Sequence, residues 1–213
     1  MRIISFLSQK GGCGKSTLAA SLGVAAKEAG EKVTLLDLDP KRSLYRWGVK
    51  RTDRGLPVRT VSPANLPAVL NSLRMARKVT LVIVDTPALE SLATTAALQA
   101  AHFSIVPARP ATFDIWASEV TGRKMKLMNK EFAFLLNQCP STRNNLHMQE
   151  SISSLESIGN LFYPYIHQRE VFLDAISAGK GVTEVDPNGL SSREIQALWK
   201  ALKLRLPKSQ TTR

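Results

Sequence analysis

Residues 10–17 read Lys10-Gly11-Gly12-Cys13-Gly14-Lys15-Ser16-Thr17, and the apolar run Ile3-Ile4-Ser5-Phe6-Leu7 stands just before them. A glycine-rich turn between a strand and a helix lets several backbone N–H groups converge on phosphate oxygens. In such a turn Lys15 adds a positive charge, Ser16 offers a hydroxyl to Mg²⁺, and the helix that opens at Ser16 adds its positive end. The stretch therefore predicts a phosphate-binding loop.

The loop departs from the common pattern G-x-x-x-x-G-K-[ST], because Gln9 stands at the position of the first glycine and Lys10 is an additional lysine. This deviant form, K-G-G-x-G-K-[ST], resembles the ParA/MinD family of ATPases. Later segments are similar to other motifs of that family. They are the second acidic motif at Asp37-Leu38-Asp39-Pro40, the Walker B segment at Asp85-Thr86-Pro87, and stretches 105–114, 168–172 and 179–184.

A chain of 213 residues fits one α/β domain. Its alternation of apolar strands with amphipathic helices predicts a mostly parallel sheet flanked by helices on both faces. The carboxyl ends of the strands should then form the ligand crevice, and the candidate site residues all stand at predicted strand ends. We therefore expect a single P-loop NTPase domain over residues 1–206, followed by a basic flexible tail at 207–213. The polar stretch 141–145 is a second candidate for a loose segment.

Several classes of protein are disfavoured by composition. Only Cys13 and Cys139 are present, so we expect no disulfide framework and treat both as spectator thiols. The three histidines lack metal-ligand spacing. No signal peptide or membrane span is apparent, which indicates a cytoplasmic protein. We also expect no winged helix ahead of the P-loop.

Positive charge dominates the chain, with 29 Lys and Arg against 17 Asp and Glu and a formal net charge of +12. Such an excess favours a polyanionic partner. Basic residues gather over 41–59 and again over 193–213, and no helix-turn-helix, zinc finger or RNP-like motif is present. We therefore expect sequence-independent contacts with DNA phosphates. The candidate contacts are Arg46, Lys50, Arg51, Lys200, Lys203 and Arg205.

The resemblance implies a division of labour among the carboxylates. Asp39 is expected to orient the water that attacks the γ-phosphate, while Asp85 holds Mg²⁺ through a water, together with the Ser16 hydroxyl. Asp37 is expected to support the metal from farther away. A capping or turn role remains open for Asp37 and Asp39, because Asp-x-Asp-Pro also suits the start of a helix at Lys41.

Two further roles also rest on the resemblance. Lys10 is expected to reach across a dimer interface to the partner's nucleotide, so that the catalytic set is Lys10, Lys15 and Asp39. Asn137 is expected to pair with the adenine edge, although it also suits a turn before Pro140. Asp114 fits either a carboxylate near the site or a helix cap. The expected nucleotide contacts are Lys10, Gly11, Gly12, Cys13, Gly14, Lys15, Ser16, Thr17 and Asn137.

Taken together, the resemblance implies a short ParA-type ATPase that uses ATP and Mg²⁺, dimerises on ATP and binds nonspecific DNA. Its turnover would be slow and stimulated by a ParB-like adaptor or another partner, and it would act in plasmid or chromosome partition or in cargo positioning. The alternatives are a MinD-like membrane-surface ATPase, a metabolic P-loop enzyme and a P-loop protein without turnover. The membrane alternative depends on the final helix, where the apolar residues Ile195, Leu198, Trp199, Leu202 and Leu206 suit either core packing or a lipid surface.

Overall fold

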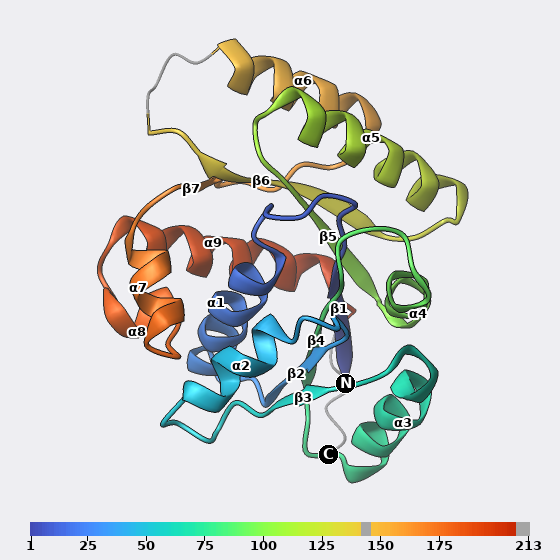
Figure 1. Cartoon of the computed structure of the whole chain (residues 1–213), viewed down its shortest axis with the longest axis vertical. Helices are drawn as coiled ribbons and strands as arrows, with labels where there is room; N and C mark the ends of the chain where they lie inside the picture. The colour runs from blue at the N-terminus through green and yellow to red at the C-terminus, as the bar shows by residue number, and fades with distance from the viewer. Residues whose placement is uncertain (142–145, 208–213) are drawn as a thin grey trace.

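Strands made of continuous apolar runs lie at the centre of the molecule, where helices cover both of their faces (Figure 1). The computed structural model describes residues 1–141 and 146–207. The strands are β1 (Arg2–Phe6), β2 (Val33–Asp37), β3 (Val58–Thr60), β4 (Leu81–Asp85), β5 (Phe103–Ala108), β6 (Phe132–Cys139) and β7 (Ile166–His167). The helices are α1 (Lys15–Glu28), α2 (Ser43–Lys50), α3 (Leu66–Ala76), α4 (Leu92–Ala100), α5 (Thr112–Leu127), α6 (Leu146–Ile158), α7 (Val171–Ser177), α8 (Val182–Val185) and α9 (Leu190–Arg205), with a 3₁₀ turn at Pro63–Asn65.

The described strands form one sheet in the order β3-β2-β4-β1-β5-β6-β7, and each neighbouring pair is parallel. This confirms the predicted α/β fold, and the described part of the sheet is parallel throughout. β1 lies between β4 and β5, so the loop that follows β1 emerges near the middle of the carboxyl edge. In sheets of this kind that edge is where ligands bind.

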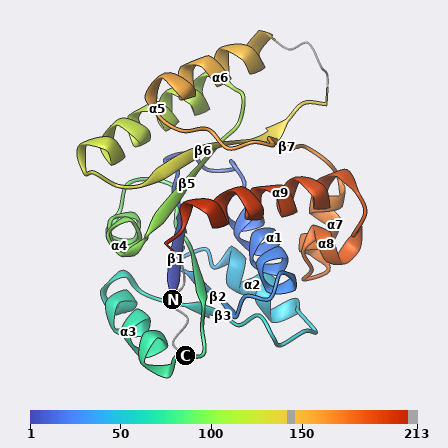
Figure 2. The same cartoon turned by 180° about the vertical axis from the view of Figure 1, so that it is seen from behind.

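Two apolar layers hold the helices to the sheet. One contains residues of α1, α2, α7, α8 and α9, and the other contains residues of α3, α4, α5 and α6. The front and back views show these two groups on opposite faces of the sheet (Figures 1 and 2).

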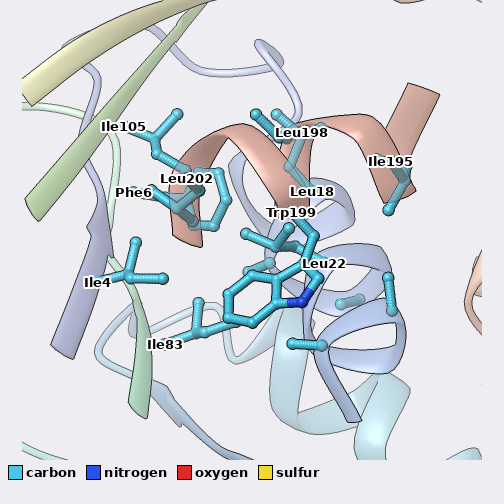
Figure 3. Close-up of a cluster of buried hydrophobic side chains, with 14 of the residues drawn as sticks. Ile4, Phe6, Leu18, Leu22, Ile83, Ile105, Ile195, Leu198, Trp199 and Leu202 are labelled. Atoms are coloured by element: carbon cyan, nitrogen blue, oxygen red, sulfur yellow. The ribbon is translucent and has the colours of Figure 1, made fainter. Parts of the chain in front are cut away.

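The final helix belongs to the first of these layers. Leu198, Trp199 and Leu202 of α9 gather with Leu18 and Leu22 of α1 beside the sheet (Figure 3), and Trp199 is only 3% exposed. Core packing is therefore confirmed for the apolar side of α9. Within residues 1–141 and 146–207, no helix combines the length and apolar content that a membrane span requires.

Two predicted loose segments fall largely outside the described residues. These are 142–145 of the polar stretch and 208–213 of the basic tail.

An ion-pair cluster links the segment that follows α2 with helix α8. The Arg51 side chain is 2% exposed and pairs with Glu184 at 2.8 Å and with Asp53 at 3.1 Å. Its guanidinium also stacks on the Trp47 ring, 4.9 Å from the centroid. The expectation that Arg51 contacts DNA is therefore wrong, because this side chain is buried and bonded within the protein.

The same cluster makes part of the stability dependent on pH. Burial acts to raise the pKa of Glu184, but hydrogen bonds from Arg51 and from the Gly181 N–H outweigh it and hold that pKa below its ordinary value. A carboxylate with a lowered folded-state pKa stabilises the protein above its unfolded pKa. That contribution disappears as pH falls through the folded pKa.

We predict that Arg51→Ala lowers the free energy of unfolding at neutral pH by about 3 kcal/mol, because it leaves Glu184 without its partner. The difference in the free energy of unfolding between wild type and Arg51→Ala should become smaller as pH falls below about 4, where the Glu184 carboxyl is protonated. Urea denaturation across a pH series measures both effects, with the exposed Arg54→Ala as the matched control. An equal loss in the two variants would contradict the role of the cluster.

Candidate nucleotide-binding site

The phosphate-binding loop runs from the end of β1 to the start of α1, and its glycines adopt the predicted turn. Gly12 and Gly14 have φ angles of 77° and 90°, in the left-handed region that favours glycine. A Cβ added at Gly14 would lie 2.3 Å from Nδ2 of Asn137. Glycine is therefore required at position 14 both by backbone conformation and by close packing.

The start of α1 is open to an anion. Gly14 caps the helix without a side-chain hydrogen bond, and no acidic residue occupies the first turn. The first N–H groups of a helix lack partners inside the helix, and the helix dipole adds positive potential there. This geometry suits a phosphate group.

Lys15 lies inside the loop and is 8% exposed. Its ammonium donates to the Lys10 carbonyl at 3.1 Å and lies 3.9 Å from Sγ of Cys13. A neutral carbonyl is a weaker partner for an ammonium than a phosphate oxygen. The lysine is thus held within the loop at a place where a phosphate could replace the carbonyl.

Two amide side chains from β6 hold the loop from the other side. Asn137 donates to the Cys13 carbonyl at 2.8 Å, and Gln138 donates to the Gly12 carbonyl at 2.8 Å. Asn137 lies within β6, so the alternative of a turn before Pro140 is wrong. Sequence reasoning missed Gln138, and its only signal was a second amide at the same strand end.

Asp85 provides a buried carboxylate beside the loop. It is 0% exposed, and its Oδ2 accepts a hydrogen bond from the Ser16 hydroxyl at 2.5 Å. Its Oδ1 has no hydrogen-bond partner among the described residues. The pKa of Asp85 is raised to about 7, because burial and the nearby Asp37 charge raise it by more than the Ser16 hydrogen bond lowers it.

These features fit a magnesium ion. Burial disfavours the ionised form of Asp85, and a cation next to the carboxylate would stabilise that form. The Oδ1 atom of Asp85 and the Ser16 hydroxyl are oxygen ligands of the kind Mg²⁺ prefers. No group of three or more His, Cys, Asp or Glu side chains arranged to hold a metal occurs in the described part of the chain. Most ligands would therefore come from water and phosphate, as is usual for Mg²⁺.

The second acidic motif lies next to this carboxylate, because Asp37 of β2 is the register partner of Asp85 on β4. Both oxygens of Asp37 accept backbone hydrogen bonds, from the Asp39 N–H at 2.9 Å and the Tyr45 N–H at 2.8 Å. Asp39 accepts the Lys41 N–H at 2.8 Å. The capping and turn bonds allowed by the sequence are therefore present, although α2 begins at Ser43 and not at Lys41.

A cleft of about 710 Å³ adjoins the loop, a volume within the usual range for small-ligand sites. Its walls include Gly14 and Thr17 on one side and residues 167–173 on the other. Arg169 fixes this second wall through two hydrogen bonds of 2.8 Å to Glu194. The cleft continues from the phosphate loop, so it has the position and size for a nucleoside.

The other predicted residues lie outside this crevice or at its rim. Lys10 is half-buried, and its ammonium lies 5.9 Å from the centroid of the Phe113 ring. Asp114 lies in the first turn of α5, as one of the two alternatives for it predicted, and its carboxylate accepts hydrogen bonds from Arg109 at 2.9 Å and 3.0 Å. The remaining candidate DNA contacts are exposed on α2 and α9, the two helices that flank α1: Arg46, Lys50, Lys200, Lys203 and Arg205.

Comparison with known proteins agrees with this geometry. The maintenance of carboxysome distribution protein A of Gloeobacter kilaueensis is 41% identical over 115 residues, which is 54% of this chain and 52% of that protein. The chain thus matches about half the length of this relative. The protein of the same name from Halothiobacillus neapolitanus is 29% identical over 196 residues, covering 87% of this chain and 88% of that one.

Solved structures share the fold. The septum site-determining protein MinD of Pyrococcus horikoshii, complexed with Mg-ADP, has a TM-score of 0.77 at 20% identity and covers 94% of this chain and 95% of its own. The model of the CobQ/CobB/MinD/ParA nucleotide binding domain matches residues 4–182, which is most of the chain. By that match the chain belongs to the CobQ/CobB/MinD/ParA family of nucleotide-binding domains.

Proposed function

We propose that this protein is a ParA-type ATPase that binds ATP with Mg²⁺ and hydrolyses it slowly. The observation that carries the proposal is the uncapped start of α1 beside the buried Asp85–Ser16 pair. Together they offer N–H donors and positive potential to phosphate, and oxygen ligands to a metal. The cleft between Thr17 and residues 167–173 would take the nucleoside, with Asn137 at its inner wall.

Each residue then has a distinct task. Lys15 would leave the Lys10 carbonyl and neutralise the β- and γ-phosphates, and the free N–H groups of the loop would bind their oxygens. Asp39, half-buried two residues after the end of β2, would orient the attacking water. Bound Mg²⁺ would neutralise charge on the transferring phosphoryl group, with Ser16, Asp85 and Asp37 holding it directly or through water.

ATP would also join two protomers, with Lys10 of each reaching the nucleotide of the other. The paired protein would bind DNA without sequence preference, since the basic residues exposed on α2 and α9 are doubled in the dimer. It would be associated with the nucleoid when ATP is bound. A ParB-like or other adaptor would stimulate hydrolysis and release.

The biological role we propose is partition or positioning of cargo, such as a plasmid, a chromosome or another large assembly. The similarity to proteins named for carboxysome distribution and the match to a family model that includes ParA support this class of role. A membrane-surface role has less support, because the apolar side of α9 packs against α1 and the sheet.

Lys15→Ala should weaken ATP binding by about 100-fold or more, since it removes a buried charge aimed at the phosphates. Isothermal titration calorimetry measures the affinity. Lys32→Ala is the matched control, because Lys32 is exposed and precedes β2 at the opposite edge of the sheet. Wild-type affinity in Lys15→Ala would reject the proposed site.

Asp39→Ala should bind ATP normally but lower kcat by about 100-fold or more, because the carboxylate positions water and does not hold phosphate. Phosphate release under saturating ATP measures turnover, with Asp174→Ala on the exposed side of α7 as control. Undiminished turnover in Asp39→Ala would move the water-positioning role to another residue.

Charge reversal at Lys200, Lys203 and Arg205 should flatten the log-log slope of DNA affinity against salt by about 5 in the ATP-bound dimer, since three contacts are lost in each protomer and each contributes about 0.9. ATP affinity should stay unchanged. Fluorescence anisotropy with unrelated duplexes, in ATP and in ADP, measures the slope. Reversal at Arg74, Arg77 and Lys78, which are exposed at the end of α3 on the other face, is the control. If the wild-type protein does not bind DNA even at low salt, or binds only one sequence, nonspecific DNA is rejected as the partner.

A further inference from the structure

One carboxylate of the last helix holds the wall of the cleft formed by residues 167–169. Glu194, on α9, is 9% exposed. Its Oε1 lies 2.8 Å from Nδ1 of His167, and its Oε2 accepts the His167 backbone N–H at 3.1 Å. Arg169 donates to both oxygens of the same carboxylate at 2.8 Å. The orientation of the His167 ring is therefore set by a residue 27 positions away in the chain.

These contacts determine which nitrogen of the His167 ring carries the proton. Burial acts to raise the pKa of Glu194, but hydrogen bonds from Arg169 and His167 outweigh it and hold that pKa below its ordinary value. The carboxylate is thus ionised at neutral pH and can only accept hydrogen bonds, so Nδ1 of His167 donates. Arg169 already gives Glu194 a full positive charge, and the ring can bond to it in the neutral form. In a neutral ring with its proton on Nδ1, the Nε2 atom is an acceptor.

The Nε2 atom of His167 is available to a molecule in the cleft. His167 lines the cleft, its side chain is 31% exposed, and Nε2 has no hydrogen-bond partner within residues 1–141 and 146–207. Asn137 and Gln138 also line the cleft, but their amide nitrogens already donate to carbonyls of the phosphate loop. His167 therefore adds an uncommitted acceptor to a cleft in which those two donors are already in use.

The rest of the lining suits a flat ring. Leu18, Phe172, Leu173 and Ile176 contribute apolar side chains to the cleft, and Leu173 is 70% exposed. A base that entered the cleft would cover apolar surface of this kind. In such sites a small number of polar groups fixes the orientation of the ligand and distinguishes it from similar molecules.

We propose that His167, held by Glu194, determines the base specificity of the cleft by accepting a hydrogen bond from the 6-amino group of adenine. The inference rests on the proposed function, in which the cleft takes the nucleoside of ATP. Guanine carries a carbonyl oxygen at the same position, so two acceptors would face each other and both would lack a donor. In this arrangement His167 contacts the base, and Glu194 is a positioning residue.

Two nucleotides that differ in a single group test this contact. The triphosphate of purine riboside is identical to ATP except that it lacks the 6-amino group. Wild type should bind ATP about tenfold more tightly than this analogue, because the analogue leaves Nε2 without a partner. His167→Ala should weaken ATP binding about tenfold and leave the affinity for the analogue within about threefold of wild type. Isothermal titration calorimetry with Mg²⁺ measures the four affinities.

The substitution leaves the wall itself in place, because the backbone N–H of residue 167 and the Arg169 side chain still bond to Glu194. Gln168→Ala is the matched control. Gln168 lines the same wall and is exposed, and its loss should change neither affinity. GTP should bind wild type at least tenfold more weakly than ATP. Thermal melting should show that both variants are folded.

The outcomes separate this inference from the proposed function. Equal affinity of wild type for ATP and the analogue would overturn the role of His167 and leave the ATP site standing. A preference for ATP that persists in His167→Ala would do the same. Equal weakening of both nucleotides in that variant would make His167 a structural part of the wall only. If wild type binds neither triphosphate, the proposed function fails and the inference fails with it.

Discussion

The burial of Asp85 at the carboxyl end of β4 is the constraint on which the site depends. A fully buried carboxylate is costly unless a hydrogen bond or a positive charge compensates it, and the Ser16 hydroxyl satisfies only one of its oxygens. The parallel register places Asp37 directly beside it, which raises the pKa of Asp85 further. A divalent cation beside Asp85 would compensate this buried negative charge.

Helix α2 connects this site to the basic surface. The Tyr45 N–H, in its first turn, bonds to Asp37, and Arg51, directly after its last residue, is clamped to Glu184. The Trp47 indole also donates to the Lys180 carbonyl at 3.0 Å. Hydrogen bonds thus hold the helix at both ends, and Arg46 and Lys50 are exposed on it.

Electrostatics divides the surface into regions with different partners. The basic residues Arg46, Lys50, Lys200, Lys203 and Arg205 are exposed on α2 and α9, whereas Glu119 and Glu90 near α5 pair with Arg123 and Lys124 of the same chain. Unpaired positive charge attracts polyanions over a distance. Where charges are paired, apolar side chains contribute most of the binding. The exposed basic residues of α2 and α9 and the exposed apolar residues of α5 thus lie on opposite faces of the sheet.

The sequence alone determined the elements whose signals are local. The glycine-rich turn and the buried parallel strands have local signals, so the turn between β1 and α1 and the strands that end at Asp37 and Asp85 were predicted correctly. Phosphate binding by residues 10–17 stays a prediction. Roles that depend on distant partners were decided only by tertiary structure. Arg51 resembled its basic neighbours until folding buried it against Glu184, a residue 133 positions away. Gln138 of β6 donates a hydrogen bond to the Gly12 carbonyl only because folding places the end of β6 beside the loop. The two-sided apolar pattern of α5 could not indicate which side faces the sheet, since periodicity gives the spacing of a face and not what covers it.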